Sequence, residues 1–151
     1  MIRFVETLED TARVGVPGRP PRRGVRGGLV FVARLARVFY VFLSSVLATG
    51  LLFQVFFAGM GAFGADWSYH VTLANFLVLP PMLMVPTAFV GRLPWALRLL
   101  PLVLVVLIGA QHALAHGVVP AAALHPVNGF LILLTSLFIV RRAWAAVRRK
   151  G

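Results

Sequence analysis

The chain contains no cysteine. Disulfide bonds, zinc sites built from thiolates and iron–sulfur clusters all require cysteine sulfur, so each is excluded. Acidic residues are almost as scarce, since four Asp and Glu stand against 15 Lys and Arg in 151 residues.

Charged residues of either sign are also few, at 13% of the chain, whereas 60% of its residues are hydrophobic. A soluble domain of this length is nearer half apolar and a quarter charged. The chain has too little polar surface to wrap a soluble core, so the excess of apolar side chains must face lipid. An integral membrane protein is the class that this composition predicts.

Four apolar stretches are long enough to cross the roughly 30 Å hydrocarbon core of a bilayer as helices. They predict spans at about 38–60, 70–91, 94–115 and 125–143. Pro80, Pro81 and Pro86 predict a kink in the second span. Pro94 and Pro126 suit the first turns of the third and fourth spans. The predicted fold class is therefore all-α, an integral membrane four-helix bundle.

The basic residues alternate with these spans in a way that predicts orientation. Residues 1–37 hold eight arginines, the turn between spans two and three holds Arg92 and Arg98, and five basic residues follow position 140. The loops at about 59–70 and 116–125 hold none. Cytoplasmic loops carry the excess of Lys and Arg in membrane proteins, so both ends should be cytoplasmic (N-in/C-in).

The polar residues lie mainly at the two ends of the chain. The predicted divisions are a basic cytoplasmic arm at 1–30, a four-helix domain at 31–144 and a basic cytoplasmic tail at 145–151. Within the arm, the apolar spacing near 1–13 suits an interfacial helix. Pro, Gly and Arg over about 16–28 predict an extended chain, followed by a turn into the membrane at about 29–37.

These basic ends also predict the partners of the chain. Basic residues next to membrane spans face anionic lipid headgroups, so we expect the termini to contact such lipids. Nucleic acid is not an expected partner, because no folded domain remains to present a basic face. Other membrane subunits are a second expected class of partner.

All four histidines fall in the outer half of the predicted bundle or at its outer surface. Ionisable residues at membrane depth are costly and mark functional sites. Polar and small residues accompany them: Gln54 lies late in span one, Gln111 late in span three, and Gly129 one turn after His125. We expect a polar cluster near the outer face, made of His70, Gln111, His112, His125, Asn128 and Gln54.

Three interpretations of this cluster remain open. In the first, His70 and His125 bind one heme b for electron transfer, with His112 as the substitute ligand and Gly129 providing clearance. In the second, His112 and His116 form a non-heme metal site together with His70 or His125, since three or four imidazoles suit Zn or Cu. In the third, the chain is a cofactor-free accessory subunit that packs against a larger membrane complex.

Other functions are not encoded in the expected bundle. Its inner half has no histidine and no acid, which excludes a two-heme electron chain or a proton relay across the bilayer. No nucleophile, base and acid are arranged as hydrolysis requires, so no enzyme is predicted. Asp66, the acid nearest the histidines, is expected to be a loop residue or a helix cap. Without Lys or Arg in the outer half, heme propionates would depend on water, Ser68, Tyr69 or histidine.

Several of these residues carry a resemblance to a known family. They are Gln54-Val55-Phe56-Phe57-Ala58-Gly59-Met60-Gly61-Ala62-Phe63, His70, Gln111 and Leu124-His125-Pro126-Val127-Asn128-Gly129. This pattern resembles a family of short bacterial four-helix integral membrane proteins of unknown function, over roughly 34–144. The resemblance implies a multi-pass protein of the bacterial cytoplasmic (inner) membrane and implies no activity. Val71 stands where that family usually has arginine. The histidine placement is also similar in architecture to heme-binding four-helix b-type cytochromes.

Overall fold

The computed structural model describes residues 23–148, and these residues form helices and no strand. The helices are α2 (Arg23–Ala62), α3 (Ser68–Phe76), α4 (Leu79–Val90), α5 (Trp95–Ala115), the short 3-10 helix η1 (Ala121–Ala123) and α6 (Leu124–Arg148). Four helical segments are long and apolar enough to cross a membrane, with α3 and α4 together forming one of them. The all-α, four-span prediction is confirmed.

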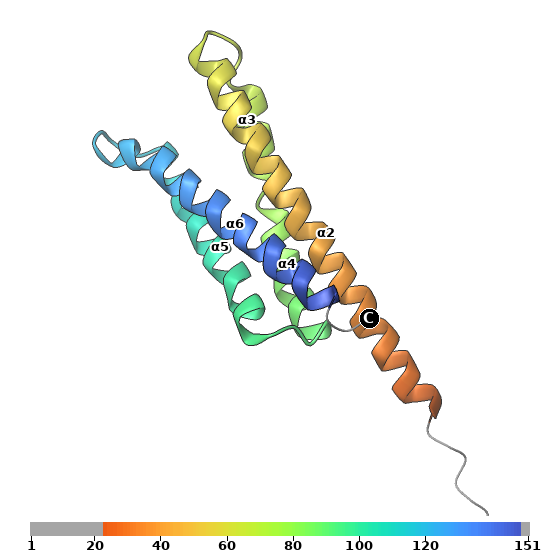
Figure 1. Cartoon of the computed structure of the whole chain (residues 1–151). Coiled ribbons are helices and arrows are strands. Elements are labelled where there is room, and N and C mark those ends of the chain that lie inside the picture. Colours follow the sequence, from red (N-terminus) through yellow and green to blue (C-terminus); the bar gives the residue numbers. More distant parts are fainter. Residues whose placement is uncertain (1–22, 149–151) are drawn as a thin grey trace, which may run out of the picture.

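The helices form a bundle in which α2 and α5 each pack against α4 and α6. The start of α2, the turn between α4 and α5, and the end of α6 lie at one end of this bundle (Figure 1). The turns that connect α2 to α3 and α5 to α6 lie at the other end (Figure 1). The described basic residues therefore gather at the first end, and the histidines toward the second.

The first helix is longer than the sequence predicted. It begins at Arg23, so the turn expected at 29–37 and the described part of the extended arm, 23–28, are helical, and both predictions are wrong. Each residue added to an existing helix gains a backbone hydrogen bond, and this outweighs the cost of about 1 kcal/mol for each glycine. The interfacial helix expected near 1–13 lies outside the described residues.

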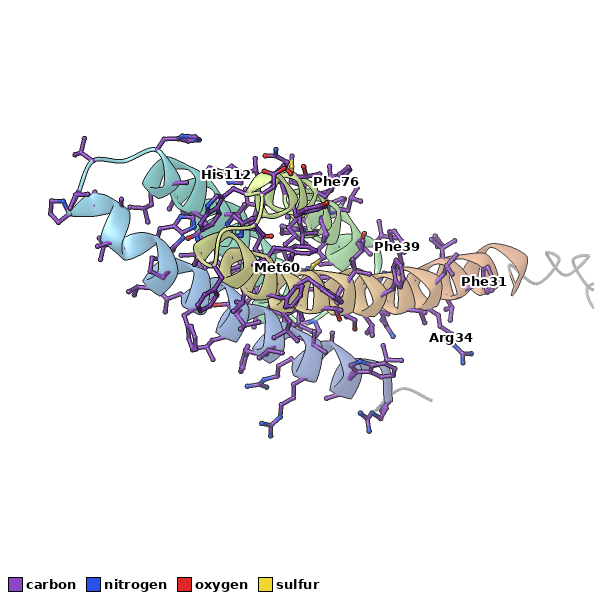
Figure 2. The ribbon with its side chains drawn as sticks, turned by 90° about the horizontal axis from the view of Figure 1, so that it is seen from above. Phe31, Arg34, Phe39, Met60, Phe76 and His112 are labelled. Atoms are coloured by element: carbon purple, nitrogen blue, oxygen red, sulfur yellow. The ribbon has the colours of Figure 1, made fainter. Side chains whose placement is uncertain are left out.

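This length makes α2 project beyond the rest of the bundle. Its 40 residues correspond to about 60 Å at about 1.5 Å per residue, twice the thickness of a hydrocarbon core. Phe31 and Arg34 lie on the projecting part, away from the other helices (Figure 2).

The predicted kink of the second span is a break at Leu77 and Val78, between α3 and α4. Pro80 and Pro81 have no N–H to donate to carbonyl groups one turn earlier, so the helix cannot run through this point unbroken. The helices on the two sides of the break have different neighbours. Helix α4 packs against α2 and α5, whereas α3 packs mainly against α2. As a result, α3 and the end of α2 diverge from α5 and α6 (Figure 1).

The third and fourth spans agree with the prediction at their starts. Pro94 directly precedes α5, and Pro126 stands in the first turn of α6. The fourth helix ends later than expected, because it continues to Arg148 and includes 145–148 of the predicted tail. Ala146 and Val147 still pack against the core, which explains this extension.

A buried tyrosine on α2 connects this helix to the first turn of α5. Pro101 lies inside α5 and cannot donate an N–H to the carbonyl of Leu97. The hydroxyl of Tyr40, which is fully buried on α2, donates a 2.8 Å hydrogen bond to that carbonyl. A neighbouring helix thus satisfies the group that proline frees, as a membrane interior without water requires. Fully buried side chains in the same core are Leu47, Met84, Leu104, Ile132 and Ile139.

We expect Tyr40→Phe to lower the free energy of unfolding by about 1–3 kcal/mol, because it leaves the Leu97 carbonyl buried without a partner. Tyr69→Phe is the matched control, since Tyr69 is 57% exposed, and its effect should stay within about 0.5 kcal/mol. Unfolding by sodium dodecyl sulfate in mixed micelles, followed by circular dichroism, measures both. A Tyr40→Phe variant as stable as the wild type would show that the hydrogen bond contributes nothing.

The loop before α3 is organised by Asp66. The carboxylate accepts hydrogen bonds from the Ser68 hydroxyl (2.6 Å) and from the Ser68 N–H (2.9 Å), which lies in the first turn of α3. Both hydrogen bonds hold the pKa of Asp66 below its usual value, and the bond from the hydroxyl has the larger effect. Asp66 therefore serves as a loop residue that satisfies a free N–H at a helix start, in agreement with the sequence.

Candidate functional site

The diverging helices enclose a cavity of about 760 Å³. One wall comes from α2 and α3, and the other from α5, η1 and α6. Its volume is typical of small-molecule sites, which range from about 300 to 1,000 Å³. The polar residues in its walls are Gln54, His70, Asn75, Gln111, His112, His116 and His125. The predicted cluster therefore surrounds one cavity, except for Asn128.

His70 is fixed to α2 by a reciprocal pair of hydrogen bonds with Gln54. The Nε2 of Gln54 donates to the backbone carbonyl of His70 at 2.9 Å, and the Nδ1 of His70 lies 3.1 Å from the backbone carbonyl of Gln54. A carbonyl only accepts, so Nδ1 carries the proton and Nε2 of the neutral ring keeps its lone pair. The Oε1 of Gln54 is buried without a partner.

Two glycines let α3 lie close enough to α2 for this pairing. A Cβ on Gly61 would come within 2.6 Å of the indole of Trp67, and a Cβ on Gly50 would collide with the side chain of Leu77. The indole in turn packs edge-on against the ring of His70, with centroids 5.6 Å apart. The small-residue face of α2 is therefore a packing surface for the residues that position His70.

His125 has an equivalent environment on the other helix pair. Its Nδ1 lies 3.2 Å from the backbone carbonyl of Gln111 in α5, so this ring also presents a free Nε2. The side chain of Gln111 is held by Asn128, whose Nδ2 donates to Oε1 at 2.7 Å and to the Leu107 carbonyl at 2.8 Å. Asn128 is buried between α5 and α6, so it positions the wall of the cavity and does not line it.

The two equivalent histidines lie near each other and come from opposite helix pairs. Their ring centroids are 6.4 Å apart and their planes are inclined by 53°. Two imidazoles on opposite sides of one metal ion, with metal–nitrogen bonds of about 2.0 Å, have centroids about 6.3 Å apart. Histidines that bind metals usually donate their second N–H to a carbonyl or carboxylate, as both rings do here. The spacing of His70 and His125 thus matches a pair of axial ligands.

The remaining two histidines are placed differently. His112 lines the cavity, but its Nδ1 lies 2.9 Å from the Ile108 carbonyl of its own helix. His116 is exposed at the end of α5. Residues 23–148 contain no group of three or more His, Cys, Asp or Glu that could hold a metal ion. The structure therefore offers no set of three imidazoles for the non-heme interpretation.

Two residues of the cavity wall were not among the predicted site residues. Asn75 lies on α3, and its amide inside an apolar span is the signal by which it could have been found. Trp67 precedes α3 and packs against His70. It gave no usable signal, because tryptophan near the end of a span is typical of any membrane interface.

Comparison of the chain with curated proteins and with solved structures gives no match. Residues 54–118 match a family of unknown function (DUF6220). The matched segment contains Gln54, His70 and Gln111, and it ends before the motif at 124–129. The chain is thus similar to an uncharacterised family across the segment that forms most of the cavity. This segment is less than half of the length of the chain.

Proposed function

We propose that this multi-pass membrane protein binds one heme b between His70 and His125 and serves in electron transfer near one membrane face. The observation that carries the proposal is the pairing of these two rings, 6.4 Å apart, across a cavity between two helix pairs. Each ring has its Nδ1 directed at the backbone carbonyl of a glutamine on the neighbouring helix. Both Nε2 atoms are then available as ligands.

The donor set favours heme over a bare metal ion. Zinc and copper sites need three or four protein ligands, whereas heme iron receives four nitrogens from the porphyrin and takes only one or two ligands from the protein. Two opposed imidazoles meet that need, and the described residues supply no third ligand beside them. When bound, heme supplies one-electron redox chemistry, while the protein supplies orientation and an apolar surrounding.

The walls of the cavity also suit a flat apolar macrocycle that carries a few polar groups. Leu51, Ile132 and Leu133 supply apolar contact, and Gly129 leaves clearance one turn from His125. Among residues 23–148, no Lys or Arg lines this cavity. The polar groups that the chain offers to propionates are therefore those of Asn75 and Gln111, together with water.

We further propose that the protein lies in a bacterial inner membrane with both ends in the cytoplasm. The described basic residues gather at one end of the bundle, and cytoplasmic loops carry the excess of such residues. Since the chain has no cysteine, single-cysteine variants report orientation directly. In whole cells, a membrane-impermeant maleimide should label Ala65→Cys and should label Arg148→Cys only after lysis. The reverse labelling pattern would overturn the orientation.

The absorption spectrum of the protein purified in detergent tests the heme assignment. We expect a Soret band, sharp α and β bands after reduction, and one heme per chain in the pyridine hemochromogen assay. These bands are typical of an iron with two imidazole ligands. A colourless protein that takes up no added hemin and co-purifies with other membrane subunits would overturn the assignment. That result would favour the cofactor-free accessory subunit.

A further inference from the structure

A second cavity, of about 480 Å³, lies at the opposite end of the bundle. It is enclosed by α2, the turn between α4 and α5, the start of α5 and the end of α6. Three arginines line it, each from a different one of these segments: Arg37, Arg92 and Arg142. Asp66 is the one acid among the described residues, and it lies at the other end of the bundle. Three arginines thus line one cavity, and the described part of the chain places no carboxylate beside them.

Each of these arginines is held in place by a specific feature. The Nε of Arg37 donates a 2.7 Å hydrogen bond to the carbonyl of Gly91. The guanidinium of Arg142 lies 5.1 Å from the ring centroid of Phe138. Arg92 has a φ of 49°, in the left-handed region that residues other than glycine rarely adopt. This conformation ends α4, because the Leu93 N–H donates to the Ala88 carbonyl and the Arg92 N–H donates to the Phe89 carbonyl at that helix terminus. The cap fixes the position at which the Arg92 side chain leaves the backbone.

The start of α5 adds to the positive potential of this cavity. Pro94, Ala96 and Leu97 contribute to its wall, and no side chain caps the first turn of the helix. The N-terminus of a long helix carries partial positive charge and free N–H groups, which bind phosphates and other anions. An anion with several oxygen acceptors therefore suits both the arginines and the helix end.

The other walls of the cavity are apolar and point to the rest of the ligand. They are formed by Leu93, Leu97, Leu100, Phe138, Ala145 and Ala146. Trp95, which is 62% exposed beside the cavity, is a residue typical of the headgroup level of a bilayer. A phosphate group with an attached hydrocarbon tail matches this combination better than a free phosphate does.

We propose that this cavity binds the phosphate of an anionic phospholipid, with the acyl chains along its apolar wall. Basic pockets between membrane helices bind such headgroups because guanidinium groups pair with phosphate oxygens in a region of reduced dielectric. The proposal uses none of the residues of the histidine cavity. It therefore stands or fails independently of heme binding.

Two double variants of the full chain test the proposal. Arg92→Gly with Arg142→Gln removes two charges from the cavity, and glycine readily adopts the left-handed φ at position 92. Arg34→Gln with Arg141→Gln is the matched control, because it removes two charges at the same end from positions that do not line the cavity and are as exposed as Arg92 and Arg142. Native mass spectrometry would follow titration of each protein with phosphatidylglycerol or phosphatidylcholine. We expect the wild type and the control to bind one phosphatidylglycerol at least about tenfold more tightly than phosphatidylcholine. The cavity variant should lose about 10- to 100-fold in its affinity for phosphatidylglycerol.

The outcomes separate the alternatives. Equal loss in the control pair, or no preference for the anionic lipid, would overturn the proposal in favour of diffuse attraction. Inorganic phosphate at millimolar concentration should leave the lipid bound, and complete displacement would identify a site for soluble phosphate instead. If circular dichroism shows that the cavity variant is unfolded, Arg142→Gln alone provides the measurement, with an expected loss of about tenfold. An unchanged affinity in that variant would overturn the proposal.

Discussion

His70→Ala and His125→Ala are each expected to abolish the spectrum of a six-coordinate heme. The two rings come from different helix pairs, so the loss of either one leaves the iron with a single protein ligand and frees one side of the cavity. Even the removal of an outer hydrogen-bond partner costs about 10- to 100-fold in metal affinity, and removal of a ligand should cost more. Heme content per chain and the reduced α band measure the effect.

Two other histidine variants serve as controls for this result. His116→Ala should keep the wild-type spectrum, because His116 is exposed at the end of α5. His112→Ala should keep it as well, because the Nδ1 of His112 bonds within its own helix and no second ring is paired with it. A spectrum that survives His70→Ala and is lost in His112→Ala would reassign the second ligand to His112.

Gly129→Leu is expected to reduce heme content at least about tenfold while the bundle stays folded. Gly129 lines the cavity, and a Cβ at this position would already lie 3.2 Å from the Nε2 of Gln111. The three further carbons of a leucine side chain would have to extend into the cavity beside His125. The backbone of α6 itself should tolerate the change, since leucine favours helix over glycine by nearly 1 kcal/mol.

Gly109→Leu is the matched control for this substitution. Gly109 is also helical, but a Cβ there would meet nothing within 4 Å, so leucine would point into open space or lipid. Heme content and thermal stability of this variant should equal those of the wild type. Full heme content in Gly129→Leu would place the ligand elsewhere, and loss in both variants would mean that damage to α5 and α6 is the cause.

The number of spans and the break in the second span followed from the sequence alone. Apolar length is a local property that the bilayer thickness converts directly into crossings. Pro80 and Pro81 act within one helical turn, because they remove hydrogen bonds to carbonyls four residues earlier. The start of α2 was not predictable in this way. Its glycines disfavour helix locally, and the cooperative extension of a long apolar helix overrides that preference.

The pairing of side chains was decided only by the tertiary structure. The sequence placed His70, His112, His116 and His125 toward one face of the membrane and named His70 with His125 in one of three interpretations. It did not predict the hydrogen-bond partners of the rings or their separation. The break before α4 turns α3 away from α5, which opens the cavity and sets His70 opposite His125.

The basic cavity arose in the same way. The sequence placed Arg37, Arg92 and Arg142 at one end of the bundle, but their convergence depends on the close approach of Gly91 to Arg37 and on the left-handed turn at Arg92. Composition along the chain determines how often and at which residues it crosses the bilayer. Which distant side chains meet depends on where helices break and on how closely helices pack. Both result from many contacts between segments, so no single segment determines them.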